Sequence, residues 1–206
     1  MGYIERIERH IERTQDLWIR GVGLFVFILV ALYIPGKLSD QAKHKELEKQ
    51  ELIAQIQDLQ NRIGFYQLNF DQQQKVMAEV DCLARNIYFE AGSEPFAGKV
   101  AVAQVTMNRV KSGDFPRTVC GVVKQKTKGI CQFSWVCIGK KSVNTSSTAW
   151  KQSKVIAENI LISKKKYGII PASVMNYHAD YVSPTWAATK TFVKQIGLHL
   201  FYKETA

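Results

Sequence analysis

The chain has 206 residues, of which 46% are apolar, and a formal net charge of +10. Once a candidate membrane segment and a linker are set aside, about 125 residues remain, which fits one compact domain. The charge is uneven, because residues 1–77 are neutral overall and the whole excess lies in residues 78–206. A basic domain attracts polyanions such as nucleic acid or an anionic cell wall, although a soluble charged surface explains the lysines equally well.

The N-terminal part predicts two helical segments. Residues 1–16 repeat a Glu-Arg pattern with isoleucines at helical spacing, which indicates a short amphipathic segment, expected on the cytoplasmic side. Residues 17–34 are 18 mostly apolar residues with one charge, Arg20, at the short end of the range for a membrane-spanning helix. No small-x-small cleavage site follows, which argues against a removed signal peptide. Residues 17–36 are therefore predicted to be a single-pass signal anchor in the inner membrane.

Residues 37–77 are predicted to form a helical stalk. Apolar residues recur there in alternating steps of four and three, at Leu52, Ile56, Leu59, Ile63, Tyr66 and Phe70. This spacing indicates a heptad seam of about two and a half repeats. A coiled-coil homodimer through the stalk is one interpretation, and a single helix packed on the domain is the other.

Residues 78–206 have the pattern of an α+β domain, with helices first and a small antiparallel sheet last. Helices are predicted over residues 79–91, 95–111, 118–124 and 146–165. The alternation of polar and apolar residues in 131–138 suggests a strand or an extended loop. Residues 172–203 give further extended segments, which form the expected sheet.

All four cysteines, Cys82, Cys120, Cys131 and Cys137, lie in this domain. An even count confined to one domain fits disulfides in an oxidising compartment, with buried free thiols as the alternative. Three pairings are possible, and the sequence does not choose among them. Disulfides would place the domain on the periplasmic or extracytoplasmic side. The spacing is not C-x-x-C and histidines are few, so no metal or other cofactor is expected.

Glu90 is the first candidate for chemistry. It ends a predominantly apolar helix, just before a Gly-Ser-Glu-Pro break and a second apolar helix. A poorly solvated carboxyl has a raised pKa, which suits a general acid near neutral pH. On spacing alone an ion pair with Arg85 or Arg109 is the better interpretation. Glu94 is four residues further on, but the break separates the two, and we expect Glu94 to cap the helix opened by Pro95.

Five more residues are candidates for binding a sugar. Gln132, Ser134 and Trp135 combine hydrogen-bonding groups with an aromatic face, and Tyr177 and His178 add a phenol and an imidazole. The motifs G-x-S-x-G, H-E-x-x-H and the P-loop do not occur, which disfavours a serine hydrolase, a zinc protease and a nucleotide-binding enzyme.

Several separated motifs resemble one known family. The strings LARNIYFEAGSEPFAGKVAVAQVTMNRV, FPRTVCGVV, CQFSWVC, NYHADYVSPTW and IGLHLFYK occur in order over roughly residues 80–203. These motifs and their order resemble those of the SleB/CwlJ family of cell-wall hydrolases, the spore cortex-lytic enzymes and their relatives. The chain departs from the family pattern at Gly92-Ser93, where relatives often have Arg-Gly, and at Ile138, where many have Asp. A predicted anchor and stalk replace the N-terminal wall-binding repeat.

The resemblance implies an enzyme that cleaves peptidoglycan glycan strands between N-acetylmuramic acid and N-acetylglucosamine, with no cofactor. It also implies a distantly lysozyme-like catalytic domain that acts as a lytic transglycosylase, with Glu90 as the catalytic acid. A membrane-anchored bacterial wall enzyme or a phage endolysin fits this organisation, and nucleic acid is not expected as a partner. The alternatives are an N-acetylmuramoyl-L-alanine amidase and a non-catalytic wall-binding protein.

Overall fold

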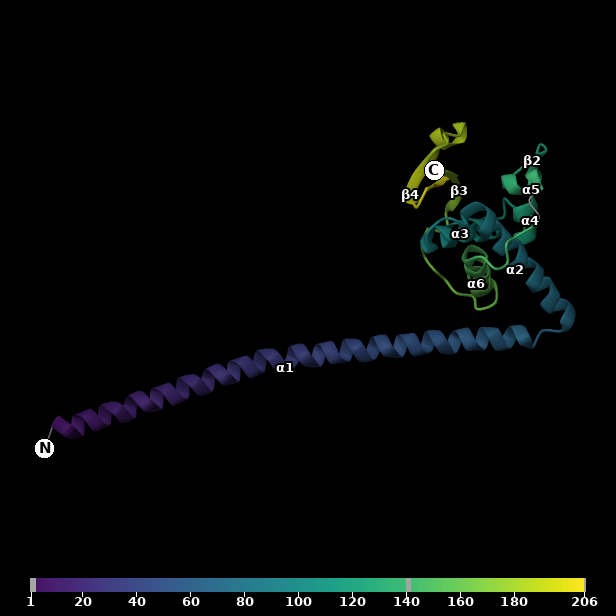
Figure 1. The fold of residues 1–206 in the computed structure, drawn as a ribbon. Helices are drawn as coiled ribbons and strands as arrows, with labels where there is room; N and C mark the ends of the chain where they lie inside the picture. The colour runs from purple at the N-terminus through teal and green to yellow at the C-terminus, as the bar shows by residue number, and fades with distance from the viewer. Residues whose placement is uncertain (1–2, 140–141, 206) are drawn as a thin grey trace. The chain divides into compact units, whose positions relative to one another are not determined.

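The computed structural model describes residues 3–139 and 142–205. The chain divides into two compact units, residues 1–56 and 57–206. A long helix, α1 (Tyr3–Tyr66), makes up the described part of the first unit, and its end belongs to the second (Figure 1). All other helices and strands of the described chain lie in the second unit.

The predicted transmembrane helix in residues 17–36 is wrong. Among the helical residues that the structure describes, no stretch is both long enough and apolar enough to cross a membrane. Arg20 interrupts the apolar run near its start, and the uncharged residues 21–34 span only about 21 Å at about 1.5 Å per residue. The hydrocarbon core of a bilayer is about 30 Å thick. The predicted single-pass inner-membrane localisation is overturned with it, and the predicted membrane contact through residues 17–34 is not shown.

The predicted seam of the stalk does not continue along one helix. Helix α1 ends at Tyr66, and Asn69 caps the next helix, α2 (Phe70–Ala91), by a reciprocal pair of side-chain hydrogen bonds with Gln72. The seam residues are exposed, and pairing of two copies through them stays a prediction. Within the second unit, the Asn61 side chain donates a hydrogen bond of 2.8 Å to the carbonyl oxygen of Ser163.

Helices α2, α3 (Phe96–Ser112) and α6 (Thr148–Leu161) form the main core of the second unit. Their apolar faces meet at side chains that are fully buried, namely Leu83, Ile87, Val100, Ala103 and Ile156. Short α4 (Val119–Lys124) packs on α2 and α3 and begins at Thr118, whose hydroxyl accepts a hydrogen bond from the amide of Gly121. The predicted helices are therefore confirmed, with ends shifted by a few residues and with α2 starting earlier.

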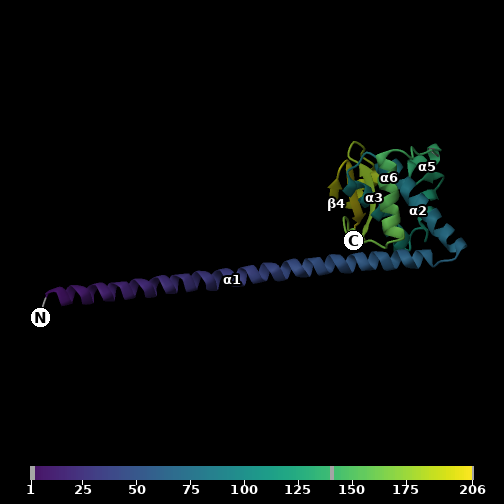
Figure 2. The ribbon, with the colours of Figure 1, turned by 60° about the horizontal axis from the view of Figure 1, so that its bottom comes forward.

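The C-terminal part forms the expected small antiparallel sheet. Its strands are β3 (Val174–Ala179), β4 (Lys190–Ile196) and β5 (His199–Glu204), in the order β3-β5-β4. A 3-10 helix, Thr185–Thr189, leads into β4. One face of the sheet covers α3, where Val174 and Phe201 are fully buried against Val102 and Val105 (Figure 2). The α+β class is confirmed.

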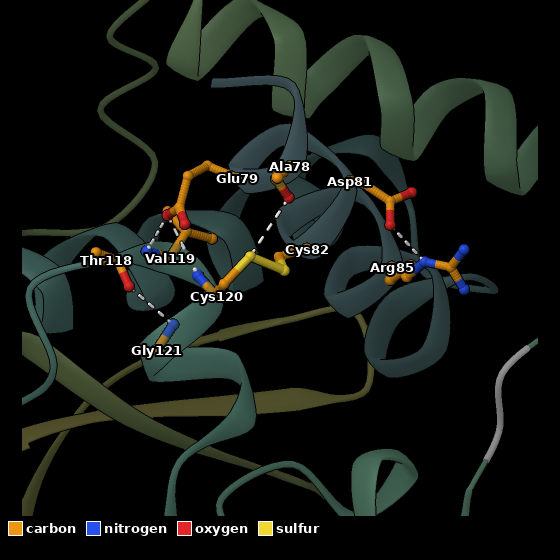
Figure 3. Close-up of a disulfide and its surroundings, with 9 residues drawn as sticks. All are labelled: Ala78, Glu79, Asp81, Cys82, Arg85, Thr118, Val119, Cys120 and Gly121. Atoms are coloured by element: carbon orange, nitrogen blue, oxygen red, sulfur yellow. Dashed lines mark hydrogen bonds and ion pairs between the residues drawn. A yellow bond between two sulfur atoms is a disulfide. The ribbon is translucent and has the colours of Figure 1, made fainter. Parts of the chain in front are cut away.

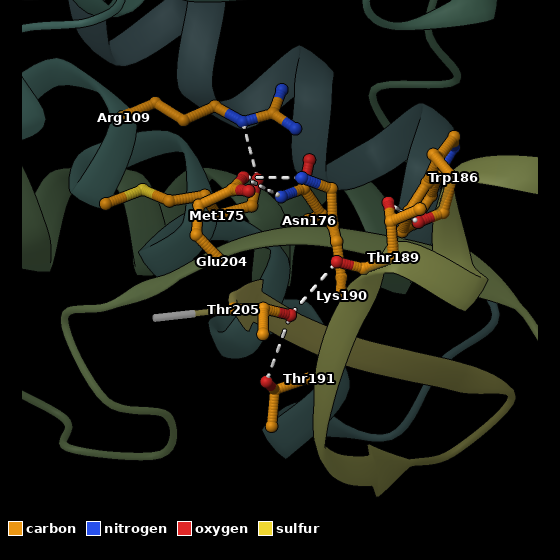
Figure 4. A network of polar contacts seen from close by, with 9 residues as sticks. All are labelled: Arg109, Met175, Asn176, Trp186, Thr189, Lys190, Thr191, Glu204 and Thr205. Carbon is orange, nitrogen blue, oxygen red and sulfur yellow. Dashed lines mark hydrogen bonds and ion pairs between the residues drawn. The ribbon is translucent and has the colours of Figure 1, made fainter.

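Polar contacts at the end of β5 tie the sheet together. Glu204 accepts hydrogen bonds from the Asn176 amide on β3 and from the Lys190 ammonium on β4 (Figure 4). On the helix side, Nε of Arg109 donates 2.8 Å to the carbonyl oxygen of Met175. These bonds fix β3, the strand that carries Tyr177, against both the sheet and α3.

The segment after α4 differs from the expected strand. It forms a two-stranded hairpin, β1 (Lys126–Thr127) and β2 (Ile130–Cys131), followed by a short helix, α5 (Ser134–Ile138). A disulfide joins Cys131 to Cys137 and holds their Cα atoms 5.8 Å apart. Six residues of extended strand would span about 20 Å, so this cross-link requires the segment to turn back. The strand prediction was therefore wrong for residues 134–138.

A second disulfide joins Cys82 of α2 to Cys120 of α4 (Figure 3). Beside it, the Glu79 carboxylate accepts hydrogen bonds from the backbone amides of Val119 and Cys120, the first two residues of α4. An acid at this end of a helix satisfies amides that lack a partner within the helix. The prediction of disulfides is confirmed, with all four cysteines paired.

Candidate active site

Glu90 lies in the last turn of α2 and is half-buried. The hydroxyl of Tyr177, from strand β3, donates a hydrogen bond of 3.1 Å to Oε2 of Glu90. The two residues are 87 positions apart in sequence, so the sheet must dock on the helices before this contact exists. A candidate acid and a sugar-binding candidate thus meet in one site.

Tyr177 remains a hydrogen-bond donor at neutral pH. The side chain is half-buried, and burial of the phenol raises the pKa of Tyr177 well above 10.0. The negative charge of Glu90 raises it further, while the charge of Arg109 opposes the shift. Ring contacts with His199 and Phe201, at centroid distances of 5.1 and 5.6 Å, hold the phenol in place.

Arg109 brings a buried positive charge to the same region. Only 6% of it is exposed, and its guanidinium lies 5.1 Å from the ring centroid of Phe115 and 5.5 Å from that of Phe133. Burial lowers the pKa of Arg109 from its ordinary value, and the nearby Tyr177 and Glu90 partly offset this. The surroundings of Glu90 therefore include a hydroxyl donor and a cation as well as the apolar side chains expected from the sequence.

Trp135, which belongs to α5, contacts α2 at Asn86, one turn before Glu90. Its indole Nε1 donates 3.0 Å to Oδ1 of Asn86, and its ring stacks on Phe89 at a centroid distance of 4.7 Å. Asn86 is fully buried, and its amide nitrogen donates 3.2 Å to the hydroxyl of Thr106 on α3. Because residues four apart share a helix face, Asn86 places the indole beside Glu90.

The other sequence-predicted site residues lie further from this contact. Gln132 and Ser134 are exposed on the disulfide-closed segment that carries Trp135, and Gln132 donates 3.3 Å to the hydroxyl of Thr127. His178 follows Tyr177 in the strand, so its side chain points to the opposite face of the sheet. There it hydrogen-bonds the hydroxyl of Tyr202 at 3.0 Å. The structure brings Trp135 and Tyr177 to Glu90, and it does not bring His178 there.

Glu94 has a different role from the predicted helix cap. The start of α3 has no side-chain cap, and Oε2 of Glu94 accepts a 3.0 Å hydrogen bond from the amide of Leu198 in the β4–β5 turn. The turn passes so close that a Cβ on Gly197 would lie 1.8 Å from that oxygen, and Gly197 has φ +58°. Glu94 is therefore structural, as expected, but it holds the sheet to the α2–α3 break.

Sequence reasoning missed two of the residues that build the site. Asn86 was not singled out, although it lies four positions before Glu90 and between apolar residues of the face that includes Leu83 and Ile87. Arg109 was named only as an ion-pair partner. Among the described residues, no group of three or more His, Cys, Asp or Glu side chains is placed to hold a metal ion.

Comparisons with known proteins agree with the resemblance seen in the sequence. A family model described as cell wall hydrolase matches residues 93–202. Spore cortex-lytic enzymes of Bacillus cereus and of Bacillus subtilis (strain 168) are 30% and 28% identical to the chain over 125 and 123 residues. These alignments cover 61% and 60% of this chain but only 44% and 37% of the relatives. The chain therefore spans less than half the length of these curated relatives.

Two solved structures are similar over the same share of the chain. The catalytic domain of the germination-specific lytic transglycosylase SleB from Bacillus anthracis is 31% identical, with a TM-score of 0.47. The catalytic domain of the Bacillus cereus SleB protein is 30% identical, with a TM-score of 0.45. Each comparison covers 61% of this chain, and 93% and 89% of the respective solved chains.

Proposed function

Because the chain belongs to the cell wall hydrolase family, the SleB/CwlJ-like family that its motifs resemble, we propose that it cleaves the glycan strands of peptidoglycan with Glu90 as catalytic acid. The matched residues begin just after Glu90, so its role rests on the sequence motif and on the geometry of the site. The observation that carries it is the hydrogen bond from the Tyr177 hydroxyl to the Glu90 carboxyl.

In the proposed reaction, the Glu90 carboxyl donates its proton to the oxygen that links N-acetylmuramic acid to N-acetylglucosamine. The C1–O bond breaks, N-acetylglucosamine leaves with a free hydroxyl, and an oxocarbenium-like centre forms at C1 of the muramic acid. The Glu90 carboxylate then takes the proton of the 6-hydroxyl of the same sugar, and that oxygen attacks C1. The product is the 1,6-anhydro sugar, and Glu90 is protonated again, so one carboxyl alternates between acid and base.

The neighbouring residues support this use of a single carboxyl. Tyr177 stays protonated and directs its O–H toward one oxygen of Glu90, which fixes the orientation of the carboxyl group. Glu94, the nearest acid along the chain, is held by the amide of Leu198, so we assign both proton transfers to Glu90. In the same proposal Trp135 and Tyr177 contact the sugar rings, and Gln132 and Ser134 contact more distant parts of the glycan strand. His178 is left out of the site, because it lies on the opposite face of the sheet from Tyr177 and hydrogen-bonds Tyr202.

The test is the variant Glu90→Gln, assayed by the clearing of purified sacculi. The neutral amide of Gln keeps the shape of the carboxyl group but has no acidic proton. General acid catalysis contributes roughly 100-fold to 10,000-fold, so we expect the rate of clearing to fall by at least about 100-fold. The control is Glu158→Gln on α6, whose carboxylate makes only a surface ion pair with Lys154 at 3.9 Å and which should clear normally. Clearing by Glu90→Gln at the rate of the unaltered protein would disprove the assignment.

A further inference from the structure

A cavity of about 450 Å³ is lined by Trp135, and Glu90 is not part of its lining. Helices α2, α4 and α5 contribute its walls, with lining residues Asp81, Cys82, Arg85, Val123, Lys124, Trp135, Val136 and Gly139. Its volume is in the range of cavities that hold small ligands. None of the chemistry proposed for Glu90 uses it.

The walls of this cavity are cross-linked. The Cys82–Cys120 disulfide ties α2 to α4, and the Cys131–Cys137 disulfide closes the segment that carries Trp135. Trp135 itself is held by its hydrogen bond to Asn86 and its stacking on Phe89. A site whose walls are fixed before binding loses little conformational entropy when it is filled.

The charged groups of the lining favour an anion. Asp81 and Arg85, both on α2, form an ion pair in which Nε of Arg85 lies 2.7 Å from Oδ2 of Asp81. Figure 3 shows this pair. Lys124, exposed at the end of α4, adds a second cation, so the lining carries one acid and two basic side chains. With the acid already paired, a ligand that presents a carboxylate near an aromatic face complements this lining best.

The cavity is also placed on the expected course of a long substrate. Arg85 and Glu90 are five residues apart on α2, which is a rise of about 7.5 Å. Asn86 and Phe89, which hold Trp135, lie between them in the helix. Arg85 and Glu90 point about 140° apart around the helix, and Trp135, which also lines the cavity, is held on the residues between them. A polymer bound at Glu90 is therefore expected to extend over the indole toward the cavity.

We propose that this cavity is a second substrate subsite, in which Lys124 binds a carboxylate of the wall polymer. The proposal rests on the proposed function, because it takes the glycan strand as the substrate. In peptidoglycan such carboxylates come from two sources, the peptides attached to muramic acid and, where the peptide is removed, the lactyl group itself. Their shared chemistry is an anionic carboxylate carried one or more bonds away from the sugar ring.

The experiment uses the full chain with the substitution Lys124→Met, and Lys126→Met as its control. Lys126 is exposed on β1, close in sequence but outside the lining of the cavity. Rates are measured over a range of concentrations of sonicated glycan strands that keep their peptides. Loss of one exposed charge contact is expected to raise KM by about twofold to fivefold in Lys124→Met, with kcat unchanged. Lys126→Met should match the unaltered protein.

Two further substrates separate the possible explanations. With strands whose carboxylates have been amidated, Lys124→Met and the unaltered protein should have the same KM, because the anion is gone. With peptide-free strands, a remaining difference identifies the lactyl carboxylate as the ligand, and its loss identifies a peptide carboxylate. An unchanged KM for Lys124→Met on untreated strands, or an equal rise on amidated strands, would overturn the subsite. Failure of the proposed function would instead show as full activity of Glu90→Gln.

Discussion

The hydrogen bond between Tyr177 and Glu90 joins a strand to the end of a helix, and it organises the site at the scale of single residues. A phenol whose pKa is raised by burial donates its hydrogen bond to the carboxyl, and the buried Arg109 cation interacts electrostatically with both Tyr177 and Glu90. Glu90 is therefore held in a defined orientation by groups that do not themselves take part in the bond cleavage.

The variant Tyr177→Phe tests this arrangement. It removes the donated hydrogen bond and keeps the ring packed on His199 and Phe201. Hydrogen bonds to charged groups contribute about 1.5–3 kcal/mol, so we expect kcat on sacculi to fall about 10-fold to 100-fold. The melting temperature should change little. Tyr167→Phe, which loses a hydroxyl contact to Asn159 elsewhere in the domain, is the control. An unchanged kcat in Tyr177→Phe would show that the bond does not serve catalysis.

The sequence could predict those features of the site that depend on neighbouring residues, and not the contacts between residues far apart in the chain. Glu90 could be identified from its helix and its motif, and Tyr177 was a candidate because of its chemistry. Their pairing could not be derived, since it depends on how β3 docks on α3. Likewise, helical spacing places Asn86 beside Glu90, but nothing local indicates that Asn86 binds the indole of Trp135.

At the scale of elements, the site depends on how the β4–β5 turn is fastened to the α2–α3 break. Glu94 accepts the amide of Leu198, and Nδ1 of His199 lies 3.9 Å from the other oxygen of Glu94. His199 is only 7% exposed, and its ring contacts Tyr177. A loss of this fastening would therefore move the strand that positions the phenol against Glu90.

His199 makes this element sensitive to acid. Burial lowers the pKa of His199 from 6.5, with His178 acting in the same direction and Glu94 and Asp180 against it. The folded protein thus holds His199 neutral at pH values where the unfolded chain binds a proton, so the free energy of unfolding falls as pH drops below about 6.5. We expect urea denaturation at pH 7.5 and 5.5 to show this loss, and His199→Gln to show less of it.

The control for this prediction is His44→Gln, because His44 is exposed on α1 and belongs to the first unit. His44→Gln should lose as much stability between the two pH values as the unaltered protein. If His199→Gln also loses the same amount, the acid sensitivity arises elsewhere.

The elements also show where local patterns failed. Helices with strong caps, such as α4 at Thr118 and α6 at Ser147, formed close to the predicted positions. The prediction failed for α5, because alternation in 131–138 indicated a strand while the Cys131–Cys137 bond, whose pairing the sequence left open, demanded a turn. The prediction of a transmembrane helix in residues 17–36 also failed. It was based on the apolar character of the segment, although the uncharged run is too short to cross a bilayer.

At the scale of the whole molecule, everything that builds the site lies in the second unit. The buried core, both disulfides and the contacts of Glu90 all fall within residues 57–206. The alignments with cell-wall enzymes cover 61% of the chain. The family resemblance could be recognised from the sequence because each of its motifs is a continuous stretch of residues. The motifs are separated along the chain, but all of them lie within this unit.

A fragment of residues 57–206 is therefore expected to fold and to act alone. Its melting temperature should lie within about 2 °C of that of the full chain, since the buried apolar residues that the structure describes all lie between Val80 and Tyr202. It should also clear sacculi at the rate of the full chain. Circular dichroism and a clearing assay measure both, and a fragment that is unfolded, or folded but inactive, would assign residues 1–56 a part in stability or in catalysis.

In the proposed reaction one carboxyl, Glu90, cleaves the glycan strand by intramolecular transfer to the 6-hydroxyl. Mass spectrometry of the soluble products from a sacculus digest tests this reaction. We expect muropeptides that end in 1,6-anhydro-N-acetylmuramic acid, each lighter than its hydrolysed counterpart by one water, and none from Glu90→Gln. Free stem peptides with intact glycan strands, or the same anhydro products from Glu90→Gln, would contradict it.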